Sequence, residues 1–221
     1  MKKIVLFLLF IAISYLSYNY HLFFSSNIIH EIQIKGDFNY SNQKKINNYL
    51  NSFVGSKLFE IDLRELKSKL EAHIWIKNAQ VIREPPDLLI VKLSEYIPLF
   101  LWNKEFYIDE DGVLFNANTP IIDNIPNINS DSMDHQIMYN LYNNLVEIFK
   151  NTGLEINSIS KNDDMLKIST TNMKFLVRYS IYKEKLEEFV SVYDQFIEIK
   201  SLPGGIKTID LRYPTGGFSV H

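Results

Sequence analysis

The residues most able to do chemistry in this chain are its histidines, its neighbouring carboxylates and its glycine-containing loops. A helical zinc site typically uses two histidines four residues apart, with a glutamate close by. The five histidines of the chain have no such spacing: they are His21, His30, His73, His135 and His221. The sequence therefore predicts no metal site.

Two clusters of carboxylates are candidates for metal or acid–base sites. Residues 109–112, Asp-Glu-Asp-Gly, begin like a calcium loop. The next ligand positions hold Val113, Leu114 and Phe115, which offer no side-chain oxygen to a hard cation. This cluster therefore predicts a β-turn. The pair at 163–164 lies in a polar segment that is typical of a solvated turn.

The remaining motifs of catalysis are absent from the sequence. There is no cysteine, no Gly-x-Ser-x-Gly elbow, no Walker loop and no GxGxxG. We therefore predict no catalytic residue, no cofactor and no small-molecule substrate, and a protein that is not an enzyme. The net charge of −3 leaves no basic surplus to neutralise phosphates, which argues against a nucleic-acid partner.

The N-terminal segment predicts the topology. Residues 4–24 contain no charged side chain and, at about 1.5 Å per residue, are long enough to cross a hydrocarbon core of about 30 Å. Lys2 and Lys3 precede this stretch, and positive charge on the short leading side favours an inside N-terminus. We expect a cytoplasmic tail at 1–3, a transmembrane helix at 4–24 and the rest of the chain outside the cytoplasm.

A cleaved signal peptide is the alternative interpretation of the same segment. Residues 4–13 would be its apolar region and 12–14, Ala-Ile-Ser, its cleavage site, so that a secreted binding module would be released. Aromatic residues continue beyond that point, where the interfacial belt of a membrane anchor would lie: Tyr15, Tyr18, Tyr20, Phe23 and Phe24. They favour an uncleaved anchor that contacts membrane lipid.

The next part of the chain alternates between two kinds of periodicity. Three stretches are typical of strands: residues 28–35, 79–83 and 88–93. Between the first two, two helices are expected, one capped by Ser41 and one by Asp62, because apolar residues follow each cap at helical spacing. The order is β-α-α-β-β over residues 28–96.

Pro98 marks the boundary to a second domain, expected at 97–221. Its apolar stripes predict helices at 133–150 and 182–200. The strands expected there are 106–108, 113–115, 155–160, 165–170, 174–179 and a late one around 209–213. The fold class is α+β: a transmembrane helix, a β-α-α-β-β domain, then a mixed domain built on an antiparallel sheet with two helices.

Several of these segments, in this order and spacing, resemble the FtsQ/DivIB family of bacterial division proteins. The resemblance covers almost the whole chain, and its first domain resembles a POTRA domain. It is carried by residues 32–36, 55–62, 75–81, Arg83, 85–86, 88–93, Glu95, Pro98, Trp102, Asp109, Gly112, Phe115 and 210–213.

The resemblance implies a single-pass type II protein of the bacterial inner membrane, with most of its chain periplasmic, at the division septum. It implies a scaffold that binds FtsB and FtsL-type bitopic partners within the wider divisome and helps control septal cell-wall synthesis. The cytoplasmic tails of family members are often longer than the tail expected here, residues 1–3. The alternative is a POTRA-bearing accessory of outer-membrane protein assembly or secretion, although those usually carry tandem POTRA repeats or a barrel.

The resemblance also implies a partner-binding site. In the family the partner adds a strand near the C-terminal edge of the sheet, which transfers to Tyr213, Thr215 and Gly216. Relatives often place an aromatic soon after the glycine turn, where this chain has Phe218 before His221. An exposed late strand is a template for such β-augmentation, and a neighbouring aromatic can anchor the incoming segment.

Overall fold

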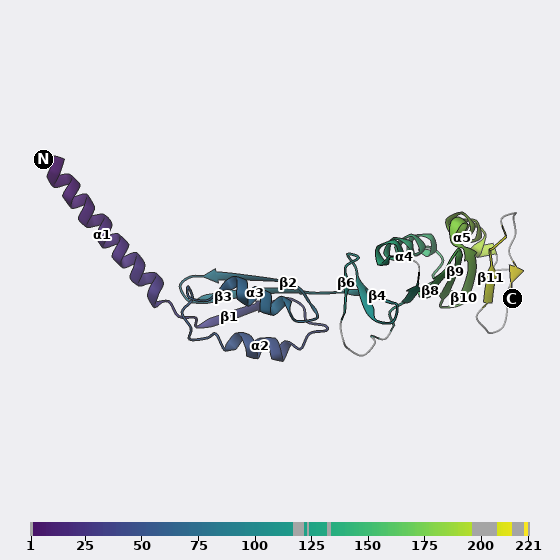
Figure 1. Cartoon of the computed structure of the whole chain (residues 1–221), viewed down its shortest axis with the longest axis horizontal. Coiled ribbons are helices and arrows are strands. Elements are labelled where there is room, and N and C mark those ends of the chain that lie inside the picture. The colour runs from purple at the N-terminus through teal and green to yellow at the C-terminus, as the bar shows by residue number, and fades with distance from the viewer. Residues whose placement is uncertain are drawn as a thin grey trace. The chain divides into compact units, whose positions relative to one another are not determined.

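The computed structural model describes residues 2–116, 122, 124–131, 134–195, 207–213 and 219–220 (Figure 1). The chain forms two compact units, residues 1–96 and 97–221. Helix α1 (Lys2–Ser26) confirms that the N-terminal segment is helical. Among the side chains that the structure describes, no helix combines the length and the apolar character needed to cross a membrane.

The segment after α1 is bonded to the first unit from its first residue onward. The Asn27 carbonyl accepts a hydrogen bond from the Leu58 N–H at 2.9 Å, and the Ile29 N–H donates to the Ser56 carbonyl at 2.9 Å. The His30 N–H donates to the Asp87 carbonyl at 3.0 Å, and the Ile29 side chain is fully buried. The strand expected at 28–35 is therefore regular only from residue 31.

The first unit has the expected β-α-α-β-β order. Its three strands form one sheet in the order β1-β3-β2, with β3 parallel to β1 and antiparallel to β2 (Figure 1). Two short helices pack their apolar stripes on this sheet and enclose the core. The elements are β1 (Glu31–Lys35), α2 (Gln43–Asn51), α3 (Leu63–Glu71), β2 (Ile76–Glu84) and β3 (Leu88–Glu95).

Of the two predicted helix caps, one is confirmed and one is wrong. Asp62 caps α3, where its Oδ1 accepts the N–H groups of Arg64 at 2.8 Å and Glu65 at 3.1 Å. Helix α2 begins after Asn42, one residue later than expected. Asn42 provides the cap instead, because its Oδ1 accepts the Lys45 N–H at 3.0 Å, while the Glu95 carboxylate accepts the Ser41 N–H at 2.8 Å in the preceding loop.

Two of the residues that carry the family resemblance have clear structural roles in this unit. Gly36 follows β1 at a φ of +147°, and a Cβ there would lie 2.3 Å from the Leu93 carbonyl oxygen. Arg83 donates from Nε to the Leu58 carbonyl at 2.9 Å and from Nη2 to the Ile61 carbonyl. It thereby fastens the connection between α2 and α3 to strand β2.

The second unit contains a nine-stranded sheet in the order β12-β11-β10-β9-β8-β7-β4-β5-β6 (Figure 1). Its strands are β4 (Pro98–Trp102), β5 (Phe106–Asp109), β6 (Leu114–Phe115), β7 (Asn127–Ser130), β8 (Ile156–Asn162), β9 (Met165–Thr170), β10 (Met173–Arg178), β11 (Lys207–Asp210) and β12 (Ser219–Val220). Its helices are α4 (His135–Phe149) and α5 (Tyr182–Ser191), with the 3-10 turn η1 (Tyr179–Ile181) before α5.

The prediction of an antiparallel sheet in this unit is wrong, because the sheet is mixed. The pairs β7–β8 and β10–β11 are parallel, and α4 and α5 lie between their strands in the chain. A helical crossover carries the chain back to the starting end of a sheet, so the next strand runs parallel to the last. The pair β4–β7 is parallel as well.

Both helices of the second unit cover the same face of the sheet (Figure 1). The ring centroid of Phe175 on β10 lies 5.2 Å from the ring centroid of Phe149 on α4. It lies 5.3 Å from the ring centroid of Phe189 on α5. The predicted helix at 182–200 is interrupted, because α5 ends at Ser191, Val192 forms a turn, and residues 193–195 are helical again. Residues 196–200 lie outside the described chain.

The predicted turn at 109–112 is confirmed. Asp109 is fully buried, and its Oδ1 accepts the N–H groups of Asp111 at 3.0 Å and Val113 at 2.7 Å. The carboxylate therefore stabilises the turn between β5 and β6.

Candidate partner-binding edge

The C-terminal edge of the nine-stranded sheet is built from two short strands. β11 lies parallel to β10, with Lys207 opposite Met173 and Asp210 opposite Leu176. β12 lies antiparallel to β11 as the outermost strand, with Val220 opposite Ile209 and Ser219 opposite Asp210. The late strand expected at 209–213 therefore starts and ends earlier, and the chain's own last strand covers part of it.

Tyr213 is the one predicted site residue that the structure describes. It lies three residues beyond β11, and 55% of it is exposed. Thr215, Gly216 and Phe218 lie outside the described residues, as does His221. We use the name docking edge for β11, β12 and Tyr213.

The segment that joins β11 to Tyr213 is held by a buried carboxylate. Asp210 is 3% exposed, and its Oδ1 accepts hydrogen bonds from the backbone N–H of Arg212 at 3.1 Å and from its Nε at 2.8 Å. Its Oδ2 accepts a second bond from Nε at 3.0 Å and pairs with Nη2. The hydrogen bonds and negative charge of Asp210 raise the pKa of Arg212 above its ordinary value, so this guanidinium remains charged.

The sheet face opposite the two helices carries hydroxyls and cations beside the docking edge. A shallow depression of about 680 Å³ lies over strands β8 to β11. Within the described residues, neither Lys167 nor Lys174 forms an ion pair. We call this surface the open face; the polar residues lining it are Ser158, Ser160, Lys167, Ser169, Lys174, Thr208 and Arg212.

Sequence reasoning missed the open face, although a signal for it exists. In β9 and β10, Lys167, Ser169 and Lys174 alternate with buried residues such as Ile168 and Phe175. Alternation with period two places one set of side chains on each face of a sheet. The polar set could therefore have been assigned to one common surface.

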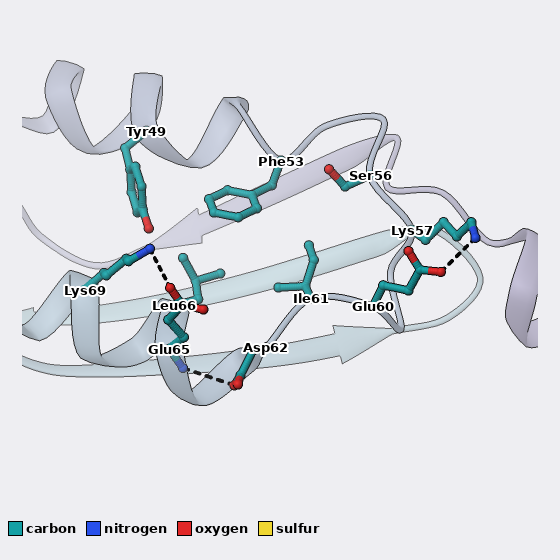
Figure 2. Close-up of a pocket in the computed structure, with 10 residues that line it drawn as sticks. All are labelled: Tyr49, Phe53, Ser56, Lys57, Glu60, Ile61, Asp62, Glu65, Leu66 and Lys69. Atoms are coloured by element: carbon teal, nitrogen blue, oxygen red, sulfur yellow. Dashed lines mark hydrogen bonds and ion pairs between the residues drawn. The ribbon is translucent and has the colours of Figure 1, made fainter.

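The first unit contains a separate depression of about 300 Å³ between α2 and α3 (Figure 2). Tyr49 and Phe53 line it on one side, with their rings edge to face at 5.5 Å. Both lysines there are already paired, Lys57 with Glu60 and Lys69 with Glu65, each at 2.7 Å. The hydrogen bond to Glu65 raises the pKa of Lys69. Because these cations are neutralised locally, this site is a weaker candidate than the docking edge.

Comparison with known proteins agrees with this division of the chain. The model described as "Cell division protein FtsQ/DivIB, C-terminal" matches residues 100–212, half of the chain, and the model "POTRA domain, FtsQ-type" matches residues 28–96. The chain belongs to the FtsQ/DivIB family. The FtsQ-type POTRA match also favours a division protein over the alternative of an assembly or secretion accessory.

Three curated relatives, each named "Cell division protein FtsQ", show the extent of the similarity. The protein from Hahella chejuensis is 27% identical over 58% of this chain and 46% of its own length. That from Cellvibrio japonicus is 23% identical over 84% of this chain and 58% of its own length. The protein from Alcanivorax borkumensis is 23% identical over 85% of this chain and 74% of its own length. The chain thus spans about half the length of the first two.

In this FtsQ/DivIB family member the matched region includes β11 and the ion pair between Asp210 and Arg212. Tyr213 follows directly after it. The docking edge therefore begins within the matched range, with β11, and continues beyond it with Tyr213 and β12.

Proposed function

We propose that this chain is a non-enzymatic scaffold of the divisome whose docking edge binds FtsB and FtsL-type partners. The observation that carries the proposal is Tyr213, a large aromatic side chain that is 55% exposed next to the edge of a sheet. An exposed aromatic is costly to leave in water and is typical of the anchors that dominate protein interfaces. Family membership supports the cell-division role.

The physical mode of binding that fits this edge is β-augmentation. Within the part of the chain that the structure describes, β12 consists of Ser219 and Val220 and pairs with Asp210 and Ile209 of β11. An extended partner segment would gain main-chain hydrogen bonds along this edge, and its side chain would pack on Tyr213.

The positive charge of the open face supports a partner segment with acidic side chains. Lys167 and Lys174 are exposed on neighbouring strands and lie next to hydroxyl groups. Complementary charge speeds encounter and fixes orientation more than it raises affinity. The partner segment therefore carries acidic side chains beside its docking strand, and rising salt slows its association.

The proposed location is the bacterial inner membrane at the division septum, with residues 1–3 cytoplasmic, 4–24 as the anchor and the two units periplasmic. The support is an uncharged stretch at 4–24 within a helix of 25 residues that exposes large apolar side chains such as Leu6, Phe7 and Phe10. From there the scaffold would help control septal cell-wall synthesis through its partners.

The test of this function is Tyr213→Ala in the full-length protein. We expect an FtsB-type partner to bind about 5- to 150-fold more weakly, which corresponds to the 1–3 kcal/mol of a truncated aromatic anchor. Co-purification from native membranes identifies the partner, and titration calorimetry gives the affinity.

Two control variants sharpen this measurement. Tyr213→Phe keeps the ring and should retain most of the affinity. Val146→Ala removes a side chain that is 44% exposed on helix α4, on the other side of the sheet, and should leave binding unchanged. Unchanged affinity in a folded Tyr213→Ala variant would refute the proposal, and recovery of secretion components would favour the accessory class.

A further inference from the structure

Asp210 is a buried carboxylate in an unusual position, at the last residue of a strand and three residues before the proposed anchor. A carboxylate loses much of its hydration when it is buried, so it needs strong partners. Here four contacts of its oxygens go to Arg212, two residues along the chain. This carboxylate therefore orders the chain where it leaves β11.

The contacts fix both the backbone and the side chain of Arg212. The bond to its N–H sets the direction in which the chain leaves β11, while the adjacent Leu211 N–H donates to the Leu176 carbonyl on β10 at 2.8 Å. The bonds to Nε and Nη2 hold the guanidinium plane against the carboxylate, a geometry that lysine cannot reproduce. The side chain of Arg212 is nevertheless 43% exposed and lines the open face.

We propose that Asp210 is a positioning residue of the docking edge, which holds Arg212 and the start of the following segment so that Tyr213 is presented to the partner in a fixed direction. This inference rests on the proposed function. Asp210 itself, being buried, does not contact the partner. Its contribution is that side chains already ordered before binding lose less conformational entropy when the complex forms.

The expected effect follows from the number of side chains that Asp210 orders. Immobilising one flexible side chain at an interface reduces affinity by about 2- to 13-fold, and Arg212 and Tyr213 are two such side chains. Asp210→Asn keeps the shape and one acceptor oxygen but removes the charge. We expect it to weaken binding of the FtsB-type partner by about 5- to 100-fold, mostly through faster dissociation.

A double-mutant cycle separates positioning from a general structural role. In an Arg212→Gln background the carboxylate has no guanidinium to hold, so Asp210→Asn should change affinity by less than about 2-fold. Arg212→Lys keeps the charge without the two-pronged geometry and should behave like Asp210→Asn. Hydrogen exchange on the free protein should show faster exchange at the Arg212 N–H, with the amides of β10 unchanged.

The outcomes distinguish this inference from the proposed function. If Tyr213→Ala weakens binding while Asp210→Asn leaves affinity unchanged, or the two substitutions at 210 and 212 are additive, the positioning role is refuted and the docking edge stands. If Tyr213→Ala has no effect, the proposed function itself fails. If Asp210→Asn unfolds the sheet, Arg212→Lys decides: wild-type affinity in that variant overturns the inference.

Discussion

Replacement of Gly36 by alanine tests whether the close approach of two backbones holds strand β1 in place. The added Cβ would lie 2.3 Å from the carbonyl oxygen of Leu93, whereas real Cβ contacts stay beyond 3.0 Å. The backbone must therefore move by about 0.7 Å, because a carbonyl oxygen cannot rotate away as a side chain can. Lys35 pairs with Lys92 at this end of the parallel ladder, so the movement would separate β1 from β3.

The cost has two parts that can be measured separately. A φ of +147° disfavours any residue with a Cβ by about 1–3 kcal/mol, and overpacking adds about 1–3 kcal/mol. Gly55 is a matched control: its φ is +88°, but an added Cβ would meet nothing within 4 Å. We expect Gly36→Ala to reduce the free energy of unfolding by about 2–6 kcal/mol. Gly55→Ala should cost the φ contribution alone, about 1–3 kcal/mol, less the small gain from a stiffer unfolded chain.

Urea unfolding of the full-length protein gives the two free energies, and hydrogen exchange shows where the structure loosens. Faster exchange in Gly36→Ala should be confined to the first unit and should be strongest at the amides of β1. Equal destabilisation by the two alanines, within about 0.5 kcal/mol, would show that the contact with Leu93 is relieved without cost and would refute the reasoning.

Two further predictions concern the first unit. Arg83→Lys should reduce the free energy of unfolding by about 1–3 kcal/mol, because one ammonium cannot serve the Leu58 and Ile61 carbonyls as the guanidinium does; an unchanged urea midpoint would contradict this. The N–H groups of Glu65 and Arg64 lower the pKa of Asp62 below its ordinary value of 3.8. The hydrogen bonds to the ionised Asp62 carboxylate therefore stabilise the folded protein fully above pH 3.8. This stabilisation is lost as the pH falls through the folded-state pKa of Asp62. Hydrogen exchange of α3 should show this loss in the natural protein and not in Asp62→Asn.

The order of elements in the first unit could be predicted because local signals and packing agree there. Asp62 both caps α3 and precedes its apolar stripe, and the Pro85-Pro86 turn separates two strands. The cap of α2 is displaced by one residue, because Ser41 and Asn42 are both good capping residues and only the fold shows that Asn42 accepts the Lys45 N–H. The bond from the Ser41 N–H to Glu95, 54 residues away, leaves no local pattern in the sequence.

The second unit shows a different limit. Strand β7, with the sequence Asn-Ile-Asn-Ser, is short and polar, so it lacks the run of apolar residues that predicts a strand. It forms because α4 returns the chain beside it and β8 then pairs with it in parallel. The sequence does not predict strand β4, because Pro98 indicates a domain boundary there, although proline is tolerated as the first residue of a strand. Tyr213 was predicted from resemblance; its exposure could come only from the fold.

The backbone bonds that begin at Asn27 determine how far the first unit can travel. One residue of chain spans at most about 3.6 Å, and Asn27 is already bonded one residue beyond the end of α1. Anything that binds α1 therefore keeps the first unit within a few ångströms of the end of that helix. A force on the helix is transmitted directly to the connection between α2 and α3. A flexible insert at this point would lengthen the linker and lower the local concentration of the first unit at any surface to which α1 is bound.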